Sequence, residues 1–234
     1  KITQAIIEKR QEDFKKNGKL NVYTVDPDKD SIKLGSFQVD FFRVNHNIPD
    51  GFGVVIKSPV GSVMHTGDFK FDPAPVGEKP TDIEKIKKFG QQGLRVLMSD
   101  STGSEIEGDS ISEQSIMETL DQIIKGNKNR IIIATFSSLL SRIQQIIFLA
   151  EKYGRKVSVQ GYSMKSNVEI AKKLGYLKVR EGTLVSPKEM QDLPKEKVIV
   201  ACTGAQGEDR AVLMRIANKE HRDIKLIRGD SVIF

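Results

Sequence analysis

The hydrophobic pattern of this chain changes near residue 90. Before that point, a helical pattern at residues 3–16 is followed by short β-type runs that are separated by turn residues. The runs predict strands at residues 20–25, 32–44, 53–58 and 62–66. Pro59 and Gly61 predict a tight hairpin between the last two, since proline fixes φ and glycine tolerates positive φ. We expect a mainly antiparallel α+β half.

After a loop at residues 72–80 and a short helix at 83–89, apolar runs alternate with helical patterns. The alternation predicts a parallel, Rossmann-like sheet, because parallel neighbours need helical crossovers. The expected class is therefore α/β, in two pieces joined near residue 90. The expected strands cover residues 94–99, 130–136, 156–160, 197–202 and 224–227, and the expected helices cover 112–125, 138–153, 165–174 and 209–219.

Composition fits an enzyme piece from a reducing compartment, which we expect to be the cytoplasm. The 234 residues contain no apolar run of the roughly 20 residues that a membrane span needs, and no targeting segment is visible. The single cysteine, Cys202, excludes an internal disulfide and lies in an apolar run, so we interpret it as a buried side chain. A net charge of +6 favours a polyanionic partner, although many lysines alternate with glutamates as on solvated helix faces.

His46 and Asp68 are the candidate metal ligands. His46 lies two residues after the apolar run 41–44 and before the turn Pro49-Asp50-Gly51. Asp68 follows Gly67 at the end of another expected strand. Imidazole and carboxylate are ligands that zinc accepts. Taken alone, a histidine beside a turn and an aspartate after a glycine are also common in loops without metal.

Several strings, in order along the chain, resemble one enzyme family. They are His-Asn-Ile-Pro-Asp at 46–50, His-Thr-Gly-Asp-Phe-Lys-Phe-Asp at 65–72, Ser-Asp-Ser-Thr at 99–102, and the strand-to-helix strings at 134–138, 161–164 and 202–208. The chain resembles the ribonuclease J group of nucleases, which combine a metallo-β-lactamase fold with a β-CASP domain. The resemblance implies a partial metallo-β-lactamase αββα sandwich over residues 1–90 and a β-CASP domain over residues 91–234.

The resemblance also implies roles for residues. His46 would be a zinc ligand, Asp68 would bridge two zinc ions, and Asp100 would lie beside the metals. Asp68 and Asp100 would both act in catalysis, whereas His65 would bond or pack without binding metal. Without the resemblance, Asp100 reads as a cap of a helix or turn. Single-stranded RNA would contact residues at the carboxyl ends of the parallel strands. For each serine or threonine hydroxyl there, ordinary helix capping is the alternative role. The RNA-binding candidates are Ser137, Ser138, Ser163, Thr203 and Gly204.

Departures from the family pattern are as informative as the matching strings. Tyr162 stands where the family usually has arginine, and Leu139 and Leu140 stand where it has polar residues. No H-x-H-x-D-H string is present, and the three histidines cannot replace it. The chain starts without methionine and stops inside an apolar run at residues 231–234, which predicts the middle of a longer protein. We expect negligible hydrolysis from these residues alone.

The activity implied for the longer protein is that of a zinc-dependent ribonuclease. It would act as a 5′-3′ exonuclease and cut internally, in RNA decay and rRNA maturation, and would form dimers or tetramers. Two alternatives stay open: a β-CASP nuclease that acts on DNA or in RNA 3′-end processing, and a non-catalytic RNA-binding scaffold. Nucleotide cofactors are not expected, because the chain contains neither a GxxxxGK[ST] phosphate loop nor a GxGxxG dinucleotide fingerprint.

Overall fold

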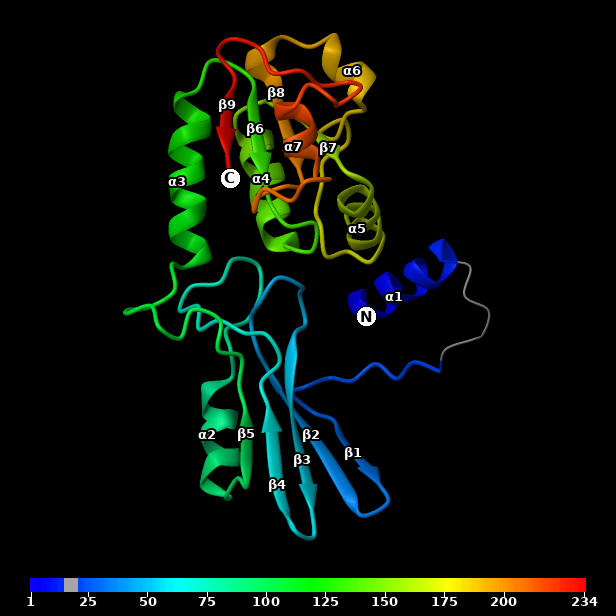
Figure 1. Ribbon diagram of the computed structural model, residues 1–234, viewed down its shortest axis with the longest axis vertical. Coiled ribbons are helices and arrows are strands. Elements are labelled where there is room, and N and C mark those ends of the chain that lie inside the picture. Colours follow the sequence, from blue (N-terminus) through cyan, green and yellow to red (C-terminus); the bar gives the residue numbers. More distant parts are fainter. Residues whose placement is uncertain (15–20) are drawn as a thin grey trace. The chain divides into compact units, whose positions relative to one another are not determined.

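The computed structural model describes residues 1–14 and 21–234, which form two compact units, Lys1–Gln114 and Ser115–Phe234 (Figure 1). The division falls later than the junction predicted near residue 90. The reason is the strand β5 (Val96–Met98), which pairs in parallel with β4 (Gly61–His65) and so belongs to the first sheet. The sequence analysis placed this strand in the second sheet, and that placement is wrong.

The first unit contains one sheet in the order β1-β2-β3-β4-β5. The strands β1 (Ser31–Leu34), β2 (Phe37–Arg43), β3 (Phe52–Ser58) and β4 form an antiparallel meander, and the predicted hairpin joins β3 to β4 with Ser58 opposite Gly61. The helices are α1 (Ile2–Asp13) and α2 (Ile83–Gln91). Apolar residues from β2, β3, β4 and α2 pack into a core of Phe42, Val44, Val55, Met64 and Phe89.

The second unit contains the parallel sheet that the alternating pattern predicts, in the order β7-β8-β6-β9. Every residue of β6 and β8 is buried, as expected for central parallel strands covered on both faces. The strands are β6 (Ile131–Ala134), β7 (Lys156–Gln160), β8 (Val198–Cys202) and β9 (Ser231–Ile233). The helical elements are α3 (Glu113–Gly126), whose first two residues belong to the first unit, α4 (Leu140–Lys152), α5 (Tyr162–Lys173), α6 (Pro187–Gln191), η1 (Lys195–Lys197) and α7 (Val212–Ala217).

The α/β class is confirmed, and three further strand predictions are wrong. The run predicted as one strand at 32–44 is divided by a turn at Gly35 and Ser36 into the antiparallel strands β1 and β2. Residues 21–25 of the strand predicted at 20–25 have no strand structure, and Leu20 lies outside the described residues, as do Lys15 and Lys16 of the predicted first helix. Residues 224–227 are also not a strand. β9 takes the position beside β6 instead. The Ser231 amide of β9 donates to the carbonyl of Arg130, the residue before β6, at 3.0 Å.

Candidate active site

The backbone brings the histidine loop and the Asp68 turn together. Asn45 and Lys70 form an isolated antiparallel bridge, in which the Lys70 amide donates to the Asn45 carbonyl at 2.9 Å. His46 follows Asn45, and Asp68 lies two residues before Lys70 in a turn that begins at Gly67, where φ is +64°. Continuing this antiparallel register puts His46 across from Phe69, the residue that follows Asp68. His46 is half-buried there, and Asp68 is exposed.

Asp100 reaches the same place from β5. Its amide donates to the Thr66 hydroxyl at 3.1 Å, and the Thr66 amide donates to the Met98 carbonyl at 3.0 Å. The pKa of Asp100 is lowered mainly by the amide of Thr102, then by the Thr102 hydroxyl, with smaller contributions from the Phe69 amide and from the charge of His46. The carboxylate therefore lies beside the backbone next to Asp68. It also caps the turn that follows it, since Oδ1 accepts from Thr102 N at 2.9 Å.

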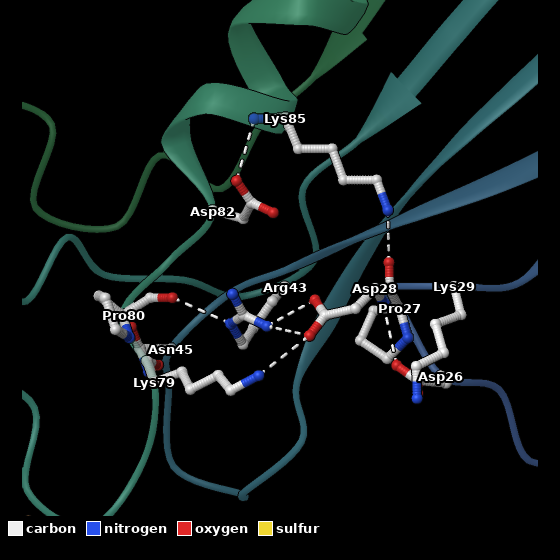
Figure 2. Close-up of polar contacts among 10 residues, drawn as sticks. All are labelled: Asp26, Pro27, Asp28, Lys29, Arg43, Asn45, Lys79, Pro80, Asp82 and Lys85. Atoms are coloured by element: carbon white, nitrogen blue, oxygen red, sulfur yellow. Dashed lines mark hydrogen bonds and ion pairs between the residues drawn. The ribbon is translucent and has the colours of Figure 1, made fainter.

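The segment 79–82 runs beside the end of β2 and forms hydrogen bonds with the residues that lead into the histidine loop. Arg43 donates from Nε to the Pro80 carbonyl at 3.0 Å and from Nη1 to Asp28 Oδ2 at 2.7 Å (Figure 2). Lys79 Nζ also contacts Asp28, at 3.3 Å, so one carboxylate links the strand end to this segment. The Asp82 amide donates to the Arg43 carbonyl at 3.0 Å.

Asn45 and Thr81 form the buried part of this support. The Asn45 amide donates to Thr81 Oγ1 at 3.0 Å, and Asn45 Nδ2 donates to the Lys79 carbonyl at 2.8 Å. The Thr81 hydroxyl lies 3.2 Å from Asn45 Oδ1 and 3.3 Å from the Lys70 carbonyl. One hydroxyl thus contacts both strands of the bridge that places His46 beside the Asp68 turn.

Charged groups surround the same bridge. Lys70 Nζ lies 2.9 Å from Glu113 Oε1 and 3.3 Å from Asp72 Oδ2, and the Asp72 side chain is fully buried. Burial raises the pKa of Glu78 to about 7, and the negative charges of Glu113 and Asp50 act in the same direction. Asn45, Thr81 and Glu78 are not predictable from the sequence, because they lie in irregular segments that have no periodic pattern.

The donor set in the described residues fits only part of a metal centre. His46, Asp68 and Asp100 are chemically suitable ligands or neighbours for zinc. Within residues 1–14 and 21–234, however, no three histidine, cysteine, aspartate or glutamate side chains are arranged to hold a metal ion. The other two histidines have hydrogen-bonding roles: His65 Nδ1 accepts from the Gly67 amide at 2.9 Å, and His221 Nδ1 accepts from the Ile224 amide at 3.2 Å.

In the second unit, the RNA-binding candidates lie at the carboxyl ends of parallel strands. Asn167 Nδ2 donates to the Ser137 carbonyl at 2.8 Å, which ties α5 to the turn after β6. Ser163 lies one helical turn before Asn167, on the same face of α5. Neither α4 nor α5 has a side-chain cap, so Ser137, Ser138 and Ser163 do not serve as caps of these two helices.

Thr203 and Gly204 complete this edge from β8. Thr203 Oγ1 accepts from the Val212 amide at 3.3 Å, so this hydroxyl bonds the first amide of α7 from outside that helix. Gly204 has φ +118°, and a Cβ there would lie 2.9 Å from Leu213 Cβ, which explains the glycine. Gly161, at the end of β7, faces Thr203 closely enough that an added Cβ would lie 3.3 Å from its hydroxyl.

Cys202 is confirmed as a core residue. Its side chain is buried, and burial raises the pKa of the thiol to about 12, so the thiolate needed for nucleophilic chemistry is not formed near neutral pH.

The four-stranded parallel sheet and the polar turns at its carboxyl edge make the second unit an α/β domain of the parallel-sheet class. Residues 128–234 match the family described as Ribonuclease J, beta-CASP domain. The chain belongs to the ribonuclease J family, and similarity to curated members extends over its whole length.

Three relatives illustrate this similarity. Ribonuclease J of Thermus thermophilus is 40% identical over 235 residues, Ribonuclease J of Synechocystis is 37% identical over 235 residues, and Ribonuclease J2 of Bacillus subtilis is 36% identical over 233 residues. Each alignment covers 100% of this chain but only 41%, 37% and 42% of the relative, respectively. The chain therefore spans about two fifths of the length of these proteins.

A solved structure shares the fold. The crystal structure of a protein of unknown function from Enterococcus faecalis superposes with a TM-score of 0.63 at 14% identity, covering 100% of this chain and 64% of the other. In the described part of the chain, no helix combines the length and the apolar character that crossing a membrane requires.

Proposed function

We propose that the protein to which these residues belong is a zinc-dependent ribonuclease that hydrolyses phosphodiester bonds in single-stranded RNA. The observations that support the proposal are the Asn45–Lys70 bridge, which pairs the residue before His46 with the second residue after Asp68, and the bond from the Asp100 amide to the Thr66 hydroxyl at 3.1 Å. Family membership supports the reaction class, since the relatives are ribonucleases by name.

His46 and Asp68 would hold zinc in this proposal. Two bound zinc ions would supply a hydroxide nucleophile near neutral pH and offset the negative charge that develops on the phosphate. Asp68 would hold and orient that nucleophile, and Asp100 would keep the Asp68 turn in place through the Phe69 amide. The second unit would contact the RNA backbone through the hydroxyls of Ser137, Ser138, Ser163 and Thr203, and Gly204 would let the backbone approach closely.

The finer activity follows from the family resemblance and is part of the proposal. It comprises 5′-3′ exonuclease and endonuclease action in RNA decay and rRNA maturation, in the cytoplasm, by a dimer or tetramer. The scaffold alternative is favoured by one observation, the lack of a three-ligand group in the described residues. The ribonuclease proposal accounts for this observation if further ligands come from the part of the relatives that the chain does not span.

The first test separates these alternatives by metal content. We expect the isolated 234 residues to bind less than one zinc per chain and to cleave RNA negligibly, because two ligands hold zinc weakly against water. Elemental analysis and a gel assay with 5′-labelled RNA measure both. Stoichiometric zinc with robust turnover would contradict the expected division of ligands.

The second test uses the longer protein. His46→Ala and Asp68→Ala should abolish RNA cleavage and lower zinc content, whereas Asp100→Asn should lower activity by roughly 10–100-fold, as is usual for residues that orient metal ligands. Asp109→Asn, which removes an exposed carboxylate in the loop before α3, is the control. Unchanged cleavage and zinc content in His46→Ala and Asp68→Ala would refute the proposal.

A further inference from the structure

Two aromatic side chains are exposed at the edge that we propose binds RNA. Tyr162 is 70% exposed and is the first residue of α5, directly after Gly161, where φ is +106°. Phe136 is 36% exposed and lies in the turn that connects β6 to α4. Single exposed apolar side chains are common on protein surfaces, and it is the position of these two rings at the ends of parallel strands that points to a binding surface.

The backbone places these two rings in equivalent positions. Each lies just beyond the carboxyl end of a parallel strand, and each precedes a serine, Ser137 in one case and Ser163 in the other. β8 separates β6 from β7, so the two strand ends are two strand spacings, or ~10 Å, apart. The bond from Asn167 to the Ser137 carbonyl holds the two turns in this arrangement.

Hydroxyls and backbone amides contact phosphates, and these contacts are nearly the same for every nucleotide. Aromatic rings bind the other part of the nucleotide, because every base has a face that stacks on a ring. We propose that Tyr162 and Phe136 form a base-stacking subsite for single-stranded RNA, with the neighbouring serines on its backbone. The inference rests on the proposed function and adds the part of the substrate that these two residues recognise.

A tyrosine at position 162 suits such a subsite better than an arginine would. A guanidinium plane also stacks on bases, but it adds a positive charge and with it a salt-dependent contribution to affinity. Tyrosine keeps a planar face and removes the charge. Tyr162→Arg should therefore retain the preference for bases and steepen the dependence of log K on log salt by about 0.7, the slope expected for one added charge on a single strand.

The experiment compares two oligomers of equal length and charge, oligouridine and an abasic RNA backbone, by fluorescence anisotropy with the intact 234-residue chain. The wild type should bind oligouridine more tightly. Tyr162→Ala should weaken oligouridine binding by about 5- to 150-fold, which corresponds to ~1–3 kcal/mol per stacked base, and leave abasic binding unchanged. Tyr162→Phe should retain the wild-type affinity, and Phe136→Ala should act as Tyr162→Ala does.

Tyr23→Ala is the matched control, because Tyr23 is 86% exposed and lies in the other unit. It should leave both affinities unchanged, and circular dichroism confirms that each variant is folded. Equal affinities of wild type and Tyr162→Ala for oligouridine, or equal losses on both oligomers, would overturn the subsite. If the wild type binds neither oligomer, the RNA-binding edge itself is wrong and the subsite falls with it. Binding of both oligomers with equal affinity would reject only the stacking.

Discussion

Replacing Thr81 with valine tests whether one buried hydroxyl holds the His46 loop to the Asp68 turn. Valine keeps the shape of the side chain and removes the oxygen that accepts the Asn45 amide at 3.0 Å. Asn45 is only 2% exposed, so water does not replace the lost acceptor freely. Leaving one buried donor unsatisfied costs roughly 1–3 kcal/mol, and we expect about 2 kcal/mol of local destabilisation.

Native-state hydrogen exchange measures this loss at the bridge itself. The Lys70 amide donates to the Asn45 carbonyl, and its exchange in Thr81→Val should be faster by ~30-fold, the equivalent of about 2 kcal/mol. Thr81→Ser retains the hydroxyl and should stay close to the wild type. In the longer protein, Thr81→Val should also lower zinc affinity, since it loosens the support of His46. Wild-type exchange at Lys70 in Thr81→Val, or an equal change in Thr81→Ser, would refute the reasoning.

Two further predictions concern stability. Gly53→Ala should lower the free energy of unfolding measured in urea by roughly 1–3 kcal/mol or more, because the added Cβ would lie 2.2 Å from the buried ring of Phe42. Gly90→Ala is the control and should be neutral or stabilising by up to ~1 kcal/mol, because the added carbon would meet no atom within 4 Å outside its own helix. Similar effects of the two substitutions would be inconsistent with this packing. The raised pKa of Glu78, about 7, implies stability that is fully present below the unfolded-state pKa near 4.5 and is lost as the pH rises through about 7. Glu78→Gln should therefore match the wild type near pH 4 and exceed it at pH 8, by on the order of 2 kcal/mol, and identical pH profiles of unfolding would contradict this.

The sequence predicted those parts of the fold that depend on short-range patterns. The hairpin at Pro59 and Gly61 follows from turn chemistry, and the strands β6 and β8 follow from apolar runs that only a sheet covered on both faces can bury. Pairing partners depend on contacts distant in sequence, and there the predictions were wrong. Residues 94–99 and 224–227 have suitable residues for strands, but the first run contributes its strand to a different sheet and the second finds no place in one.

The candidate site was predictable to a similar extent. His46, Asp68 and Asp100 stand at ends of apolar runs, where a sequence pattern exposes them, and the structure brings their backbones together. The assignment of His46 and Asp68 as zinc ligands, and of Asp100 as a carboxylate beside the metals, stays a prediction. Thr81 and Asn45 could not be identified, because their role arises from a loop that folds back on β2, and no local pattern encodes that contact.

The position of β5 affects how the candidate site assembles. β5 is three residues long and lies at the border of its sheet, where it pairs with β4. Short border strands fray more readily than central ones, since fewer hydrogen bonds must break. The hairpins from β1 to β4 form from neighbours in the chain, whereas β5 must close a loop of some 30 residues before Asp100 arrives. Fraying of this strand would displace the carboxylate of Asp100 while the histidine loop stays folded. We therefore expect Asp100 to be the last of the three candidate residues to reach its native position during folding and the first to lose it.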